Sequence, residues 1–112
     1  MQVLTQSKKE ILFWVLRLRK RQRVTGASML PGLKEGDEVL LNPRDTRPCI
    51  GDIVVARDPR QPERKLIKRV TAVDERGWAD LRGDNPTAST DSRTFGLVPP
   101  ELIVGRVTSR FF

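Results

Sequence analysis

Any catalytic chemistry in this chain must be done without histidine. The 112-residue sequence has no histidine and a single cysteine, Cys49. This excludes Ser-His-Asp and Cys-His arrangements, histidine-ligated metal sites and an internal disulfide. The remaining hydrolytic options are a serine or threonine nucleophile with a lysine base, or a pair of carboxylates. A lysine base must be neutral near physiological pH, although an ordinary lysine titrates at about 10.4.

Lys68 is the lysine whose sequence surroundings could lower its pKa. It lies in the predicted strand Arg64–Asp74, where side chains alternate between two faces. Lys68 therefore shares a face with Leu66, Val70 and Ala72, and burial among these apolar groups would disfavour the charged amine. Alternation alone favours another interpretation, in which this face is exposed at a sheet edge and Lys68 is a solubilising charge. Both stay open at this stage.

Ser28 is the candidate nucleophile. It lies between the small residues Gly26-Ala27 and the turn Pro31-Gly32, a place at a strand end where the hydroxyl and the backbone amide can both face a substrate. Serines in loops are common, so this position alone is a weak signal. The carboxylates are weaker still, because they lie among turn formers, where aspartate usually bonds local backbone: Asp52, Asp84 and Asp91.

Short β-branched segments must position these residues. The body of the chain shows no long stretch with helical spacing of apolar positions, so an all-β body is expected. The predicted strands are Arg21–Thr25, Glu38–Asn42, Asp52–Arg57, Arg64–Asp74, Trp78–Arg82 and Leu102–Val107. Two irregular stretches, Pro43–Cys49 and Asn85–Gly96, are expected as loops, and long ordered loops tend to carry function.

The positive charge is concentrated at the start of the chain. The net charge is +7, and residues 1–23 supply most of it, with seven basic side chains and one acidic one. The apolar run Ile11–Leu16 is too short to cross a bilayer, which takes roughly 20 residues. Residues 1–23 are therefore interpreted as a basic amphipathic leader with a short helix.

Two interpretations of this leader remain open. The helix could pack its apolar side on the domain, or it could lie at a membrane surface with Phe13 and Trp14 among headgroups and its arginines on anionic lipid. Nucleic-acid binding is disfavoured, because no aromatic stacking surface accompanies the basic residues.

Four segments in order resemble the sequence boxes of type I signal peptidases. They are Gly26–Pro31, Gly51–Val55, Lys68–Val70 and Gly83–Pro99, and together they extend over most of residues 24–107. The stretch GDNPTASTDSRTFG and the missing anchor resemble the nickel-type superoxide dismutase maturation proteases most. The resemblance implies a mostly β, compact signal-peptidase/LexA-like catalytic core of β-barrel type with a short N-terminal helix. Residues 24–112 would form the Ser/Lys protease domain.

The resemblance assigns roles to matching positions. Ser28 would be the nucleophile and Lys68 the general base. Ser89 would orient the lysine, and Met29 would lie near the substrate cleft. Two further residues would form a charged pair that supports the catalytic region, for which a loop ion pair unrelated to catalysis is the alternative: Asp91 and Arg93.

One departure from the family pattern concerns Gly26. Some relatives have at this position, two residues before the nucleophile, a serine whose hydroxyl helps to hold the oxyanion. The Ser28 amide is the expected donor here, and the second donor is undetermined.

The expected function is that of a serine endopeptidase that removes a short N-terminal extension from a protein precursor. The resemblance implies a nickel superoxide dismutase precursor as the substrate. No metal or other cofactor is expected, and with no histidine and one cysteine the chain is not expected to bind nickel itself. The expected location is cytoplasmic, with peripheral membrane contact through residues 1–23 and no nucleic-acid partner.

Three rival functions are weighed against this one. The first is a peripheral membrane signal peptidase that processes exported precursors. The second is a self-cleaving repressor domain, which is disfavoured because no helix-turn-helix module and no internal scissile site are evident. The third is a non-catalytic binding module, which would bind nucleic acid through the leader or protein through the sheet.

Overall fold

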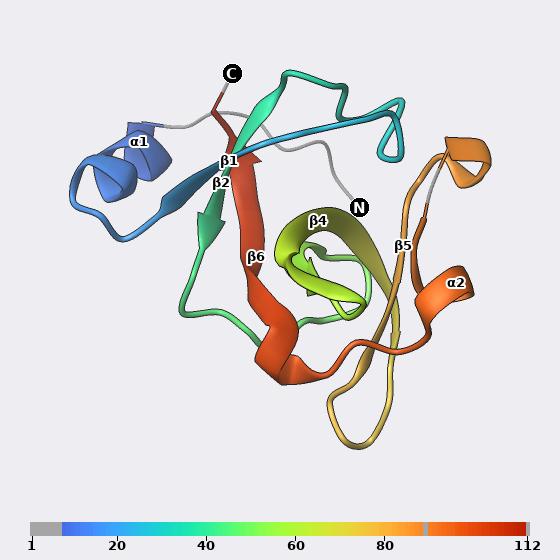
Figure 1. Ribbon diagram of the computed structural model, residues 1–112. Helices are drawn as coiled ribbons and strands as arrows, with labels where there is room; N and C mark the ends of the chain where they lie inside the picture. The colour runs from blue at the N-terminus through green and yellow to red at the C-terminus, as the bar shows by residue number, and fades with distance from the viewer. Residues whose placement is uncertain (1–7, 89, 112) are drawn as a thin grey trace.

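The described part of the chain folds around one antiparallel sheet. The computed structural model describes residues 8–88 and 90–111. These residues form six strands in the order β1-β2-β6-β3-β4-β5 (Figure 1). The strands are β1 (Lys20–Arg23), β2 (Glu38–Asn42), β3 (Ile53–Asp58), β4 (Gln61–Val73), β5 (Ala79–Arg82) and β6 (Ile103–Arg110). The expected mostly β fold is confirmed.

Helices are short and lie at the two ends of this sheet. Helix α1 (Lys8–Val15) precedes β1, and α2 (Ser92–Phe95) is a single turn after β5. Two 3₁₀ turns, η1 (Pro86–Ala88) and η2 (Pro100–Leu102), complete the loop regions. Within the described residues, no helix is long and apolar enough to cross a membrane.

The sheet buries apolar side chains on both faces, with β3 at its centre. Ile53 and Val55 face one core cluster, and the alternate residues Val54 and Ala56 face the other. The first cluster is completed by Val24, Met29, Leu33, Val39, Leu41, Ile67 and Val107. The second is completed by Val70, Ala79, Leu81, Val98 and Ile103. Because both faces are covered, β3 is a continuous apolar run rather than an alternating one.

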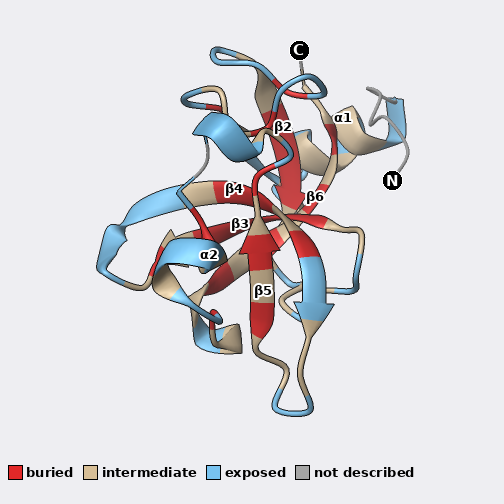
Figure 2. Cartoon of the chain, turned by 90° about the vertical axis from the view of Figure 1, so that its right-hand side faces the viewer, coloured by how far each residue is buried: buried red, intermediate tan, exposed pale blue. Residues whose placement is uncertain are grey.

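The middle of β4 is buried and both of its ends are exposed, as Figure 2 shows. The strand begins earlier than predicted, at Gln61, because a tight turn joins it to β3. In that turn the Asp58 side chain accepts a hydrogen bond from the Arg60 amide at 2.8 Å. Near the other end, the pairing with β5 shifts between Val70 and Ala72, and this bulge leaves Ala72 exposed.

Strands β2 and β6 approach each other closely at Gly105. A Cβ added there would lie 2.7 Å from Leu41 Cδ1 and 2.9 Å from the carbonyl carbon of Asn42. Glycine is therefore required where β6 crosses the shifted register of β2.

Candidate active site

Lys68 is a buried lysine in the middle of β4. Only 4% of its surface is exposed, so the interpretation as a solubilising charge at a sheet edge is wrong. The reason is its register: Lys68 pairs with Val54 of β3, and paired residues share a face. That face belongs to the second core cluster, which also contains Val70.

Burial sets the protonation behaviour of this amine. Desolvation lowers the pKa of Lys68 from its ordinary value, and the carboxylate of Asp91 opposes this by favouring the charged form. The guanidinium groups of Arg64 and Arg93 lower the pKa of Lys68 further. A general base near neutral pH requires a shift in this direction.

Ser28 lies, half-buried, in a tight loop between β1 and β2. The Leu30 amide donates to the Ala27 carbonyl at 3.2 Å and closes the turn around it. Gly26, two residues earlier, has a φ of 77°, a conformation that strongly favours glycine over serine. The backbone therefore accounts for the glycine at the position where some relatives have an oxyanion-binding serine.

The turn formed by Gly83, Asp84 and Asn85 holds the Ser28 loop. We refer to these three residues as the 83–85 turn. The Asn85 amide donates to the Ser28 carbonyl at 2.8 Å, and the Asn85 Nδ2 group donates to the Ala27 carbonyl at 3.1 Å. Two hydrogen bonds thus fix the backbone on which the candidate nucleophile stands.

The same turn is bound to the strand that carries Lys68. Arg69, the next residue along β4, donates to both carboxylate oxygens of Asp84, at 2.8 and 2.7 Å. Its third contact is a 2.9 Å hydrogen bond to the Gly51 carbonyl. Asp84 therefore forms an ion pair in addition to shaping the turn. Through these contacts the 83–85 turn joins the Ser28 loop to β4 beside Lys68.

Asp91 binds the loop after β5 to this turn. Its carboxylate is 1% exposed and accepts from the buried Gly83 amide at 2.9 Å. It also caps α2 by accepting from the Arg93 amide at 3.1 Å. The Arg93 guanidinium donates to both of its oxygens, at 3.0 and 2.6 Å. The predicted Asp91–Arg93 pair is thus present, and it lies where its charges act on Lys68.

The predicted roles of two further site residues, Met29 and Ser89, are not tested by these contacts. Met29 is 1% exposed and packs in the first core cluster, where its side chain anchors the Ser28 loop. Its place near a substrate cleft stays a prediction. Ser89 lies outside the described residues. Among residues 8–88 and 90–111, no group of three or more acidic or cysteine side chains gathers as a metal ion would need.

The sequence indicated a turn at Gly83-Asp84-Asn85, but it did not predict the Asp84–Arg69 ion pair, the hydrogen bonds from Asn85 to the Ser28 loop or the effect of Arg64 on Lys68. The available signal for the first two was the Gly-Asp-Asn motif, because its polar side chains can bond partners outside the turn.

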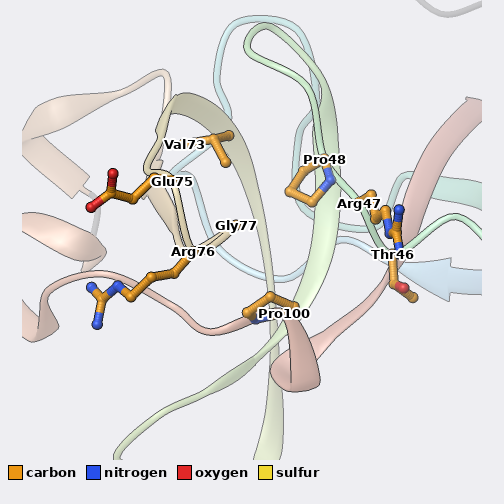
Figure 3. Close-up of a pocket in the computed structure, with 8 residues that line it drawn as sticks. All are labelled: Thr46, Arg47, Pro48, Val73, Glu75, Arg76, Gly77 and Pro100. Atoms are coloured by element: carbon orange, nitrogen blue, oxygen red, sulfur yellow. The ribbon is translucent and has the colours of Figure 1, made fainter.

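A separate hollow of about 430 Å³ lies at the Val73 end of β4 (Figure 3). Its lining residues come from the segment before β3, from the end of β4, from the β4–β5 connection and from η2: Thr46, Arg47, Pro48, Val73, Glu75, Arg76, Gly77 and Pro100. Figure 3 shows the polar ends of Glu75 and Arg76 turned away from Pro48. The hollow includes neither Ser28 nor Lys68.

Comparison with known proteins identifies the family of the chain. Residues 10–74 match the family model described as signal peptidase, peptidase S26. The chain belongs to this peptidase family. The matched region contains Ser28 and Lys68 and ends before the 83–85 turn.

The curated relatives are subunits of membrane proteases. The chain is 36% identical over 112 positions to the mitochondrial ATP-independent inner membrane protease subunit 1a of Arabidopsis thaliana, which covers 78% of this chain and 67% of the relative. It is 32% identical to the mitochondrial inner membrane protease subunit 1 of Schizosaccharomyces pombe, over 80% of this chain and 71% of the relative. For the mouse mitochondrial inner membrane protease subunit 2 the identity is 36%, over 77% and 63%. The chain thus spans about two thirds of the length of these relatives.

The names of these relatives bear on the family, substrate and location expected from the sequence. The resemblance to signal peptidases is confirmed at the level of the family. The finer resemblance to nickel superoxide dismutase maturation proteases is not supported, because the relatives are inner membrane protease subunits. The expected cytoplasmic location has no support from them either.

Proposed function

We propose that the chain is a serine endopeptidase in which Ser28 is the nucleophile and Lys68 the general base. The observation that carries the proposal is a lysine buried to 4% exposure whose strand is joined to the Ser28 loop through the 83–85 turn. Burial keeps the Lys68 amine away from solvent, and the hydrogen bonds of the 83–85 turn fix the Ser28 loop relative to β4. Family membership supports the same reaction class.

The reaction begins with proton transfer. Neutral Lys68 takes the proton from the Ser28 hydroxyl, and the oxygen attacks the scissile carbonyl to give a tetrahedral intermediate. Within the described residues the Ser28 amide has no acceptor, so it is available to donate to the oxyanion. The Lys68 ammonium then gives its proton to the leaving amine, and the C–N bond breaks to leave an acyl-enzyme.

Hydrolysis completes the cycle. Lys68, neutral again, takes a proton from water, and the hydroxide attacks the ester carbonyl. Breaking the ester bond releases the second product, and the proton returns to the Ser28 oxygen. Asp91 and Arg93 do not touch the substrate in this scheme: they position the loop beside Lys68 and set the balance of charge around it. We propose that Ser89 orients the lysine, as the family resemblance implies.

The edge of β4 offers a place for the precursor. Strand β3 pairs with β4 from Gln61 to Arg69, whereas β5 pairs with it only from Arg69 onward. Among the described strands, none covers the other edge of β4 before Lys68. An extended peptide can add to this edge through backbone hydrogen bonds and reach the dyad with its scissile bond.

The substrate class follows from the family and its relatives. We infer that the enzyme removes an N-terminal extension from a precursor presented at a membrane, because the names of the relatives place them in an inner membrane. Small side chains near the cut are expected from the family resemblance. Residues 24–112 carry all the proposed catalytic residues, so we assign this region as the protease domain and residues 1–23 as its leader.

Cleavage by the purified full chain tests the dyad. The substrates are peptides with alanine around a single cut site, a membrane-protein precursor and a nickel superoxide dismutase precursor. We expect Ser28→Ala and Lys68→Ala to abolish cleavage of whichever substrate is cut. Thr25→Ala and Lys34→Ala, at exposed positions of the connection that carries Ser28, are controls and should keep it. Cleavage that survives either dyad substitution would rule out the mechanism.

A further inference from the structure

Helix α1 is fixed to the sheet by one of its faces. The Trp14 and Phe111 rings lie with centroids 4.7 Å apart. The Glu10 carboxylate accepts hydrogen bonds from the Thr108 hydroxyl of β6 and from Arg19, the latter at 3.1 Å. Side chains of α1 that point inward therefore hold both aromatic and polar contacts, and the helix has a defined orientation on the domain.

The outward face of α1 is apolar. Leu12 and Val15 of α1 and Leu16, directly after it, are 54%, 62% and 57% exposed. The Leu16 amide donates to the Leu12 carbonyl at 2.9 Å, so the helical turn continues and the spacing of three and four residues places all three on one side. We refer to these three residues as the α1 apolar patch. A helix that packs on a protein core ordinarily turns its polar side outward, but here three apolar side chains are more than half exposed, and no element of the described residues covers them.

Exposed cations surround the α1 apolar patch. Lys8 and Lys9 lie one turn earlier on the same side of the helix, and both are exposed. Arg17 directly follows the patch and is also exposed. Two more exposed basic residues lie just beyond, in β1: Lys20 and Arg23. Apolar side chains among cations match the boundary of an anionic bilayer, where acyl chains meet negative headgroups.

We propose that the α1 apolar patch is a docking surface for an anionic lipid membrane. A nucleic acid would satisfy the cations but offers nothing to three aliphatic side chains. The residues involved differ from those expected from the sequence: Trp14 packs against Phe111 and Phe13 lies under the Arg19 guanidinium at 4.8 Å, so neither is the inserted group. Leu12, Val15 and Leu16 take that role.

The position of α1 is compatible with catalysis at a membrane. Helix α1 lies beside β1, at one end of the sheet order, whereas β4, β5 and α2 lie at the other (Figures 1 and 2). A membrane bound at α1 therefore leaves the proposed cleavage site open. The docking proposal stands on the geometry of α1 and does not depend on the dyad.

Co-sedimentation of the full chain with vesicles tests the proposal. The probes are phosphatidylcholine vesicles with and without phosphatidylglycerol, and we expect the chain to bind the anionic vesicles with a clear preference. Replacing Leu12, Val15 and Leu16 together by Gln should weaken this binding by roughly tenfold or more. Ile50→Gln removes an apolar side chain that is 70% exposed elsewhere and should leave binding unchanged.

The charge contribution is tested separately. Lys8→Gln with Lys9→Gln should weaken binding to anionic vesicles by roughly tenfold to thirtyfold, whereas Lys34→Gln with Lys65→Gln, two exposed lysines elsewhere, should change it little. High salt should weaken binding of the wild type.

Three results would overturn the docking proposal. The first is equal binding of the wild type to neutral and anionic vesicles, and the second is full binding by the patch variant. The third is a dimer of the wild type, detected by light scattering, that the patch variant no longer forms. Cleavage of a soluble peptide, measured on the same samples, should be equal in wild type and patch variant. The dyad variants should lose cleavage but still bind vesicles. This outcome distinguishes a failure of the docking proposal from a failure of the proposed function.

Discussion

Replacing Asp91 by asparagine separates the two effects assigned to this carboxylate, which are its hydrogen bonds and its charge. The substitution keeps the size of the side chain and removes the negative charge. Because the Asp91 carboxylate raises the pKa of Lys68 against the effect of burial, its removal should lower the pKa of Lys68 further. The activity should then rise at lower pH than in the wild type.

The cost in stability follows from the hydrogen-bond pattern. One carboxylate oxygen accepts from the Arg93 amide and Nε, and the other accepts from the Gly83 amide and from Arg93 Nη2. Whichever way the asparagine amide turns, its NH₂ group faces two donors. If the hydrogen bond from the buried Gly83 amide to this side chain is lost, the free energy of unfolding should fall by about 1–3 kcal/mol.

The assay is kcat/KM for a cleavable peptide as a function of pH, together with urea unfolding. The midpoint of the rise, rather than the plateau, reports the pKa of the base in the free enzyme. Asp84→Asn is the matched control, because it breaks the other two-point Asp–Arg pair, with Arg69. Asp84 is not among the charges that act on Lys68, and its pair is partly exposed, so stability should fall by less than about 1 kcal/mol.

A midpoint for Asp91→Asn that stays where it is, or that moves to higher pH, would contradict this prediction. So would a shift for Asp84→Asn as large as that for Asp91→Asn. In either case the charge of Asp91 would not be what opposes burial at Lys68.

Three further predictions concern single residues. In Lys68→Met the stability difference from wild type should depend on pH. Between the lowered folded-state pKa of Lys68 and about 10.4, the unfolded wild type binds more protons than the folded form, so in urea unfolding the wild type should gain up to about 1.4 kcal/mol of stability over the variant for each unit that the pH rises. A difference that does not change with pH would contradict this. Gly105→Ala should lower the free energy of unfolding by about 1–3 kcal/mol, because its Cβ would overlap Asn42; an unchanged thermal midpoint would show that β2 and β6 can move apart. Gly26→Ala, which forces a side chain into a φ of 77°, should cost about 1–2 kcal/mol of stability in urea unfolding and reduce kcat/KM because Ser28 is displaced; wild-type kcat/KM would contradict the link to Ser28.

The sheet was largely predictable because its strands carry a clear apolar pattern. Glu38–Asn42 was predicted with the bounds that the structure shows, and the other strands differ at their ends. The start of β4 was missed because Gln61 and its neighbours are polar and pair with β3 only as part of a hairpin. Local propensity does not contain that information.

The burial of Lys68 could not be decided from its own strand. Alternation placed it correctly with Leu66 and Val70, but whether that face meets water depends on β3, β5 and the loop with Asp91, which are distant in sequence. Pattern reasoning also placed Ala72 on the same face, and the bulge after Val70 changes its exposure. The Arg69–Asp84 pair shows the same limit, since a contact across 15 residues requires the turn geometry.

The central claim is that Lys68 is a neutral amine when it meets Ser28. The most direct measurement is an NMR titration of the side-chain amines in protein with isotope-labelled lysine, with the Lys68 signal assigned by its loss in Lys68→Met. The account predicts that Lys68 titrates below the ordinary lysine value of about 10.4 and that the rise in kcat/KM follows the same curve. If Lys68 titrates at that ordinary value, it is not the base and the proposed mechanism is wrong.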